Sequence, residues 1–144
     1  ASIQNEYSLL CRHFEPDLSE ISLHENCGLL AWSPLSRGMI SGKYLNGALP
    51  KGSRLSLDAR REHRAAPQTD AAIAAYIDLA NEHQLDVCQM ALAFVNQQPF
   101  VSSNLIGATN MQQLKSNIAS IDITLSPELI KGIKSIRRQY PAPF

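Results

Sequence analysis

A short apolar segment that runs directly into a polar turn constrains the fold of this chain more than any other feature. Residues 28–32, Gly-Leu-Leu-Ala-Trp, are almost wholly apolar and follow Asn26 and Cys27. Such a segment is typical of a parallel strand covered on both faces. Residues 33–44 then supply Ser, Pro, Gly, Arg and Lys. The pattern predicts a strand that ends at a ligand, but it also fits an ordinary loop between a strand and a helix, because Ser, Pro and Gly mark most loops.

The residue types of this turn suit a ligand that carries phosphate and a flat ring. Gly38 and Gly42 allow the backbone to approach a bound group closely. Arg37 and Lys43 carry charges that match phosphate oxygens. Trp32, at the end of the expected strand, offers a flat aromatic face to a ring.

Composition excludes several classes of protein. The 144 residues are enough for one domain, and 13 Lys and Arg balance 13 Asp and Glu, so we expect neither disorder nor a nucleic-acid partner. No apolar run is long enough to cross a bilayer and no leader pattern is visible, so we expect a cytoplasmic protein without a membrane partner. The three cysteines form no CxxC pair and the histidines have no metal-ligand spacing, so we expect neither a disulfide framework nor a metal site.

The spacing of apolar residues predicts an α/β chain with a parallel sheet. Strands are expected at residues 2–8, 28–32 and 100–106. Helices are expected over residues 16–25, from Thr69 or Asp70 as the N-cap, from Asp86 to before Pro99, from the turn at residues 107–110, and from Ser126 and Pro127. Residues 45–68 lack periodicity and predict a long loop with one helical turn, which carries the basic cluster Arg60, Arg61, His63 and Arg64.

Apolar stripes predict which side chains face the core. In the first helix the buried stripe would be Leu18, Ile21 and Leu23. In the helix after residue 110, one apolar face would hold Leu114, Ile118 and Ile121. The buried stripe of the helix after residue 69 would be Ile73, Ile77 and Ala80. In the next helix it would be Met90, Ala91, Phe94 and Val95, and in the last helix Leu129, Ile133 and Ile136.

A second turn, at residues 106–117, has the chemistry of an anion site. Gly107 ends a strand and precedes a capped helix, so free N–H groups and the positive end of a helix dipole would face the carboxyl edge of the sheet. Gln113, Ser116 and Asn117 follow on successive turns of that helix, either as surface polar residues or as ligands. The two turns would lie side by side, and in α/β barrels the loops after the seventh and eighth strands commonly build a phosphate site.

Three motifs in order resemble those of the aldo-keto reductases. They are residues 4–8, Gln-Asn-Glu-Tyr-Ser; residues 32–35, Trp-Ser-Pro-Leu, with residues 41–44, Ser-Gly-Lys-Tyr; and residues 106–109, Ile-Gly-Ala-Thr, with Gln113, Leu114 and Asn117. The likeness is greatest to the branch that contains Tas-like bacterial oxidoreductases and the β-subunits of voltage-gated potassium channels. It implies a nicotinamide dinucleotide site on a (β/α)8 barrel, with NADPH as the usual cofactor.

The resemblance also implies roles for single residues. Gln4 would hydrogen-bond the nicotinamide carboxamide and Trp32 would stack on its ring. The pyrophosphate would be lined by Ser33, Leu35, Ser36 and Arg37, with Pro34 giving shape alone. The outer phosphates would lie near Lys43 and Arg54, and the adenosine end near Gly107, Thr109, Gln113, Ser116 and Asn117. Tyr7 would form part of the site wall rather than a catalyst.

The chain also departs from the family pattern. The family's Asp, Tyr, Lys and His tetrad comes from the first half of the barrel, whereas this chain resembles the sixth strand onward, so no catalytic residue is assigned. A full barrel needs about 250 residues. We therefore expect residues 1–144 to form a single C-terminal half-barrel domain, a partial (β/α)8 barrel with strands six to eight and outer helices. Alone it would be inactive on the small carbonyl substrate of the complete enzyme.

A half-barrel would leave two unpaired strand edges and an uncovered inner face near Ile3, Leu30 and Ile106. We therefore expect a homo-oligomer or a requirement for a missing N-terminal half. Three functions follow as hypotheses. The chain is the cofactor-binding portion of an NADP-dependent aldo-keto reductase, a nucleotide-binding module without turnover, or a structural remnant that folds by self-association.

Overall fold

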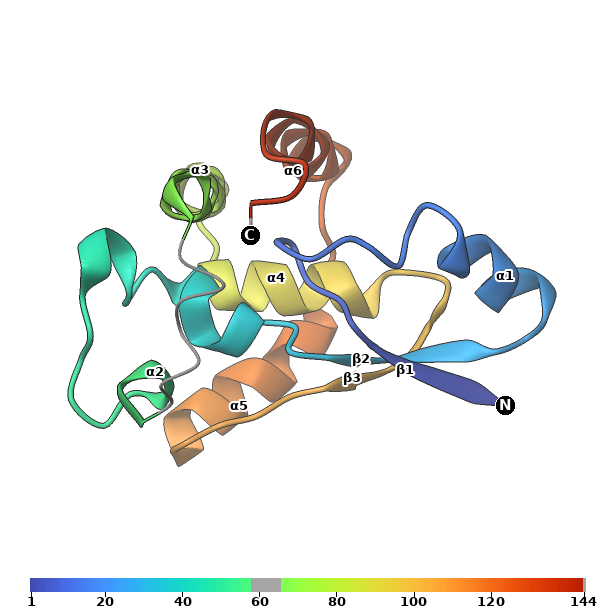
Figure 1. Ribbon diagram of the computed structural model, residues 1–144, viewed down its shortest axis with the longest axis horizontal. Coiled ribbons are helices and arrows are strands. Elements are labelled where there is room, and N and C mark those ends of the chain that lie inside the picture. Colours follow the sequence, from blue (N-terminus) through green and yellow to red (C-terminus); the bar gives the residue numbers. More distant parts are fainter. Residues whose placement is uncertain (58–65, 144) are drawn as a thin grey trace.

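The chain forms an open sheet of three parallel strands with helices packed against it (Figure 1). The computed structural model describes residues 1–57 and 66–143. The strands are β1 (Ser2–Glu6), β2 (Gly28–Trp32) and β3 (Val101–Leu105), in the order β1-β2-β3. The predicted parallel α/β architecture is confirmed, with the first and third strands shorter than expected. The basic cluster at residues 60–64 lies outside the described residues.

Helices follow each strand in the order expected of an α/β chain. They are α1 (Leu18–His24), α2 (Arg54–Leu57), α3 (Pro67–Glu82), α4 (Val87–Asn96), α5 (Met111–Ala119) and α6 (Pro127–Gln139), with shorter 3-10 turns η1 (Ser36–Ser41), η2 (Leu45–Gly47) and η4 (Ser120–Asp122). Helix α4 contacts β3, α3 and α5, and α3 also packs on α6, so α4 lies between the sheet and that pair (Figure 1). Among the described residues, no helix is long and apolar enough to cross a membrane.

The segment expected to be a long loop carries more structure than one helical turn. Both η2 and α2 fall within it. Helix α3 begins earlier than predicted, with Pro67 in its first turn and Ala66 as the N-cap. Neither Thr69 nor Asp70 caps it, because each has a distant partner. The Thr69 hydroxyl donates to the carbonyl of Pro143, and the Asp70 carboxylate accepts from the Asn46 N–H at 3.0 Å.

Within residues 1–57 and 66–143, helices cover only one face of the sheet, which corrects the expectation that β2 is covered on both. Leu29 and Ala31 are fully buried, whereas Leu30 and Trp32 are half-buried on the opposite face. We call the second face the open face. Ile3 pairs with Leu29 and therefore lies on the helix side. Ile106, which lines a pocket with helix residues, also lies there, so neither shares the open face with Leu30.

Two predicted apolar stripes are wrong. In α1, Ile21 is 53% and Leu23 50% exposed, and Leu18 is also exposed, while the buried residue is Ser22. After residue 110, Ile118 and Ile121 are exposed and Leu114 is half-buried. The described residues therefore do not cover the apolar side of either segment.

The stripes of the other three helices are confirmed. Helix α4 buries Met90, Ala91, Phe94 and Val95, α3 buries Ile73 and Ala80, and α6 buries Leu129 and Ile133; Ile77 and Ile136 are half-buried.

Tyr7 belongs to the core and not to a site wall. Its ring meets Phe100 edge-on at 5.3 Å and stacks on Phe94 at 6.0 Å, and no part of it is exposed. Its hydroxyl donates to Glu15, which also accepts from Arg12. The Arg12 guanidinium lies 4.5 Å from the centre of the Phe94 ring and is nine-tenths buried. One polar cluster thus anchors the segment between β1 and α1.

The sheet is tightest where β2 and β3 begin. Their register shifts between Leu29 and Leu30, so that Ser102 has no partner of its own in β2. A Cβ atom on Gly28 would lie 1.6 Å from the Ser102 Oγ and 2.8 Å from its Cβ. Glycine is therefore needed at residue 28 for the close approach of the strands.

Burial also controls the ionisation of two interior groups. The Tyr76 hydroxyl donates to the carbonyl of Leu9 at 3.2 Å, and burial raises its pKa to about 12. Burial raises the pKa of Cys88 to about 11, with a further rise from Asp86. Cys11, Cys27 and Cys88 are free thiols.

We expect the chain to lose stability as the pH rises above about 9. In the unfolded chain Cys88 and Tyr76 release their protons near the ordinary pKa values of 9.0 and 10.0. In the folded chain their pKa values are about 11 and about 12. The unfolded state therefore binds fewer protons over this range, and the free energy of unfolding falls. Urea midpoints measured from about pH 8 to about pH 11 test this. Cys88→Ala and Tyr76→Phe should each flatten the decline, and a midpoint constant over this range would contradict it.

Candidate functional site

The carboxyl ends of β2 and β3 lie next to each other at one edge of the sheet. Trp32 pairs with Leu105, and Gln4 pairs with Leu30 on the adjoining strand. Paired residues in a parallel sheet project to the same face, so Gln4 and Trp32 both lie on the open face, two positions apart along the strands. Gln4 is exposed and Trp32 is half-buried. An amide and an indole are thus presented on a surface that the described residues leave open.

The loop after β2 is held in a strained conformation. Ser33, Ser36 and Arg37 have φ values of 54°, 48° and 59°, which side-chain-bearing residues rarely adopt. Gly38 follows with φ 87°, and a Cβ atom there would lie 3.2 Å from the Lys43 Nζ. Residues in such conformations cluster at ligand sites, where the surrounding structure must hold them.

The side chains of this loop divide into buried and accessible groups. Pro34 and Ser36 are buried, and Leu35 and Arg37 are half-buried. The Ser36 hydroxyl contacts that of Ser8 at 2.9 Å, and its N–H donates to the Ser33 carbonyl at 2.8 Å. Ser36 therefore holds the loop from inside and offers no side chain to a ligand.

The two more distant basic residues are exposed. The Lys43 Nζ lies 5.1 Å from the centre of the Tyr44 ring. Arg54 begins α2, which contacts η1, and the next residue, Leu55, donates its N–H to the Tyr44 hydroxyl at 3.4 Å. The buried Tyr44 ring thus connects the segments that carry the two cations.

The turn after β3 is exposed and closed by its own polar residues. The Asn110 side chain caps α5 by accepting the Gln113 N–H at 2.9 Å. The Gln113 Oε1 accepts both the N–H and the hydroxyl of Thr109 at 2.9 Å. Asn117 is buried, and its Nδ2 donates to the Gly107 carbonyl at 3.2 Å. The carbonyl of Ser116 accepts from Gln89, which joins α5 to α4.

The surroundings of Gly107 are open. A Cβ atom added there would have no neighbour within 4 Å among the described residues. Space beside the backbone, in the turn that leads into the nine-residue helix α5, is what a phosphate or a nucleotide would need for a close approach.

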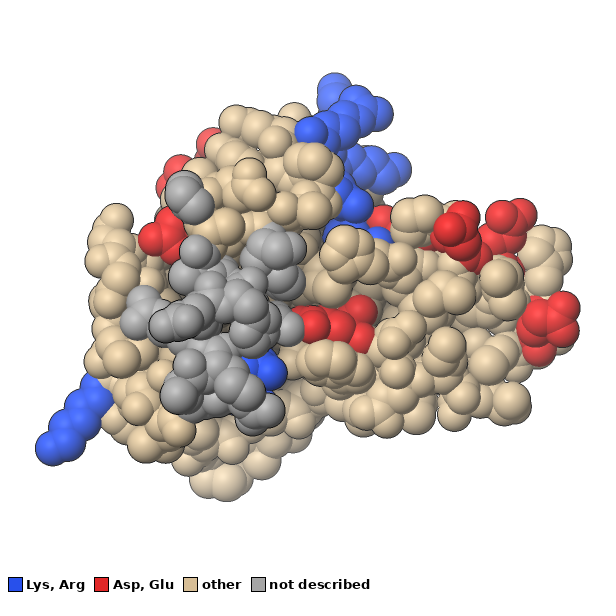
Figure 2. Space-filling model, viewed as in Figure 1, with Lys and Arg blue, Asp and Glu red and all other residues tan. Residues whose placement is uncertain are grey.

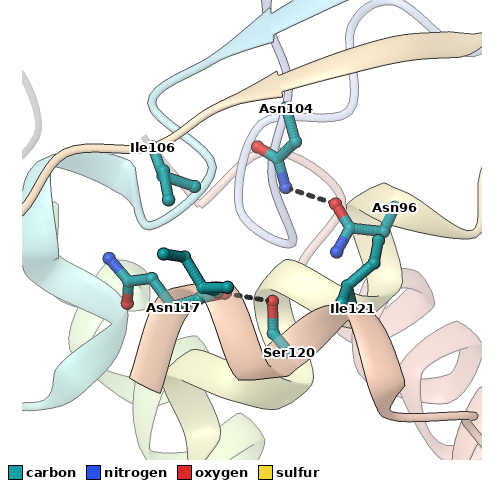
Figure 3. Close-up of a pocket in the computed structure, with 7 residues that line it drawn as sticks. Asn96, Asn104, Ile106, Asn117, Ser120 and Ile121 are labelled. Atoms are coloured by element: carbon teal, nitrogen blue, oxygen red, sulfur yellow. Dashed lines mark hydrogen bonds between the residues drawn. The ribbon is translucent and has the colours of Figure 1, made fainter. Parts of the chain in front are cut away.

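A pocket of about 160 Å3 lies beneath this turn on the helix side of β3 (Figure 3). Its lining consists of amides, a hydroxyl and isoleucines: Asn96, Asn104, Ile106, Asn117, Ile118, Ser120 and Ile121. The Asn104 amide donates to the Asn96 Oδ1 at 2.9 Å (Figure 3), while its own oxygen is buried without a partner among the described residues. Sequence reasoning missed Asn96 and Asn104, although an amide inside a predicted strand was a visible signal.

On the face drawn in Figure 2, acidic and basic side chains gather at different places. Acidic groups lie near α1 and basic groups near α6. The described residues contain no group of three or more His, Cys, Asp or Glu that could hold a metal ion.

Comparisons with known proteins extend this description. The sequence model of the Aldo/keto reductase family matches residues 1–138. Protein tas of Escherichia coli is 51% identical over 99% of this chain, and a probable voltage-gated potassium channel subunit beta of Arabidopsis thaliana is 29% identical over 96%. An L-glyceraldehyde 3-phosphate reductase of Escherichia coli O157:H7 is 30% identical over 90%. The chain spans 42%, 44% and 39% of these relatives, in that order.

The fold and the site define an α/β protein with a candidate ligand site at the carboxyl edge of a parallel sheet. The match over residues 1–138 makes the identification specific: the chain belongs to the aldo/keto reductase family. The resemblance expected from the three motifs is thereby confirmed.

Proposed function

We propose that this chain is the cofactor-binding portion of an NADP-dependent aldo-keto reductase, with β1, β2 and β3 as the sixth, seventh and eighth strands of a barrel. The observation that carries the proposal is the adjacency of the carboxyl ends of β2 and β3, with Trp32 on the open face and the uncrowded Gly107 on the neighbouring strand's turn. Members of this family generally use NADP(H). Residues 1–144 would act as one C-terminal half-barrel domain.

The donor set fits a dinucleotide. Gln4 offers an amide and Trp32 a ring on the same face, as the nicotinamide needs. The strained loop at residues 33–38 would line the pyrophosphate with Arg37, while the exposed Lys43 and Arg54 would supply cations for the outer phosphates. Gly107, Thr109, Gln113 and Ser116 would line the adenosine end, with Asn117 fixing the turn from beneath. When bound, NADPH supplies the hydride for a small carbonyl substrate.

The proposal assigns no catalytic residue to this chain. Three of the four tyrosines, Tyr7, Tyr44 and Tyr76, belong to the core. The hydroxyls of Tyr7 and Tyr76 are already bonded to Glu15 and to the Leu9 carbonyl. We therefore propose that turnover requires an N-terminal half. We further propose that this half or a second copy of the chain covers the free edges of the sheet, and that the protein works in the cytoplasm. Membership of an oxidoreductase family does not favour the alternative of a structural module without turnover.

We expect NADPH to quench the fluorescence of Trp32, which is the chain's single tryptophan. Stacking of the nicotinamide on the indole changes the emission of this residue alone, so a titration reads the proposed site directly. NADH should bind more weakly, because it lacks the 2′-phosphate that Lys43 and Arg54 would contact in NADPH. As a control, calorimetry measures NADPH binding to the Trp32→Phe variant, which lacks the fluorescent indole. Emission that is unchanged at millimolar NADPH would exclude the binding function.

Gly107→Ala should weaken NADPH binding about tenfold and leave stability unchanged. The added methyl group meets nothing in the chain itself, so a loss of affinity would come from contact with the cofactor. Gly47→Ala is the matched control, because its surroundings are equally open but its φ of 77° makes alanine strained. That variant should lower the melting temperature and leave affinity unchanged. Equal NADPH affinity of Gly107→Ala and the parent chain would place the cofactor elsewhere.

A further inference from the structure

The loops that follow β1 and β2 are joined by a hydrogen bond between two buried serines. The Ser8 Oγ lies 2.9 Å from the Ser36 Oγ, and the two residues are 1% and 0% exposed. Ser8 follows β1, while Ser36 begins η1. This contact therefore connects the strand that carries Gln4 to the loop at residues 33–38.

The direction of this hydrogen bond follows from the other partners of Ser8. The Ser8 Oγ accepts the N–H groups of Leu10 at 3.2 Å and Cys11 at 3.0 Å. A hydroxyl has two acceptor lone pairs and one proton, so the Ser8 proton goes to Ser36. Removing the Ser36 hydroxyl would leave a buried donor without its acceptor, which is more costly than the bond itself is stabilising.

The bond acts where the backbone is most strained. Ser36 begins a run of left-handed residues that continues through Arg37 and Gly38, and Ser33, three residues earlier, is left-handed as well. A left-handed serine persists only when its surroundings hold it. Within the loop, the Ser36 N–H bond to Ser33 is local, whereas its hydroxyl is anchored in the segment after another strand.

We infer that Ser8 is a positioning residue for the cofactor loop, and that it acts through its hydrogen bond to Ser36. The inference rests on the proposed function in one respect, which is that the loop at residues 33–38 holds the pyrophosphate. Without the bond, the loop would populate its binding conformation only part of the time. The apparent dissociation constant rises in proportion to the lost population. We expect a tenfold increase, which corresponds to about 1.4 kcal/mol.

The first measurement uses the chain without ligand. Hydrogen exchange of the amides at residues 33–38 should become faster in Ser36→Ala and in Ser8→Ala. Ser22→Ala is the matched control, since Ser22 is also buried and its hydroxyl donates to the Cys27 carbonyl at 2.5 Å. Cys27 precedes β2, whereas the loop at residues 33–38 follows it. The Ser22→Ala variant should lower global stability and leave the loop amides unaffected. Loop exchange that is unchanged in Ser8→Ala, or equally raised in Ser22→Ala, would overturn the inference.

The second measurement compares two ligands by calorimetry. NADP+ contains the pyrophosphate, whereas 2′-phospho-AMP lacks both the pyrophosphate and the nicotinamide. Ser36→Ala and Ser8→Ala should weaken NADP+ about tenfold and leave 2′-phospho-AMP unchanged. Equal weakening of both ligands would indicate general destabilisation and would overturn the positioning role. If the parent chain binds neither ligand, the proposed function fails and the cofactor role of the bond fails with it, even where the exchange result shows that the bond holds the loop.

Discussion

Replacing Glu15 with alanine is expected to destabilise the chain by about 3 kcal/mol. Glu15 accepts from both Arg12 and Tyr7, and the Arg12 guanidinium is nine-tenths buried against the Phe94 ring. One Arg12 nitrogen, Nη1, already lacks a partner among the described residues, so loss of the carboxylate would leave an uncompensated charge in the core. Chemical denaturation with urea measures the change.

Two further variants test the cause of this loss. Glu20→Ala removes a carboxylate that is 75% exposed and lies 3.9 Å from His24, and it should change stability by less than about 0.5 kcal/mol. Replacing both partners, as Arg12→Met with Glu15→Ala, should cost less than Glu15→Ala alone because no buried charge remains. If Glu15→Ala and Glu20→Ala unfold at the same urea concentration, the buried cluster contributes nothing to stability.

Gly28→Ala is expected to cost about 3 kcal/mol through overpacking of the sheet. The new methyl group would lie 2.8 Å from the Cβ of Ser102, and no side-chain rotation moves that atom because the strand backbone fixes its position. The strands would have to separate, and the pairing of β2 with β3 would weaken next to the register shift. A loss of this size is a large fraction of the stability of a typical domain. Thermal and urea unfolding measure it.

The companion variant is Ser102→Gly, which removes the Oγ and Cβ atoms that the new methyl group would meet. Combined with Gly28→Ala it should recover much of the lost stability, although Ser102→Gly alone weakens β3 slightly. A double variant as unstable as the sum of the single changes would show that the clash is not the cause.

Patterns within single segments predicted the elements well. The apolar run at residues 28–32 predicted β2, Ser126 and Pro127 predicted the start of α6, and Asp86 predicted the start of α4. In each case the signal and the structure lie within a few residues of each other. The N-terminus of α3 was misplaced because Thr69 and Asp70 bond to residues 143 and 46, which no local pattern reveals.

The candidate site divides in the same way. Its residue types and their order along the chain could be predicted, including the indole at the end of β2 and the glycine after β3. The inward direction of Ser36 and the burial of Tyr7 could not, because each depends on a partner in another segment. The exposed apolar side chains of α1 show the same limit, since a stripe of leucine and isoleucine does not specify whether a second surface will cover it.

The sequence by itself determined that three strands alternate with helices, that turns rich in polar residues and glycine follow the second and third strands, and that the motifs belong to one family. These properties are encoded in neighbouring residues, whose spacing controls local backbone conformation. Only the tertiary structure decided which face of the sheet is covered, where Gly28 is required and how Ser8 reaches Ser36. Those outcomes depend on contacts between residues distant in the chain, and side-chain packing settles them only once the strands have paired.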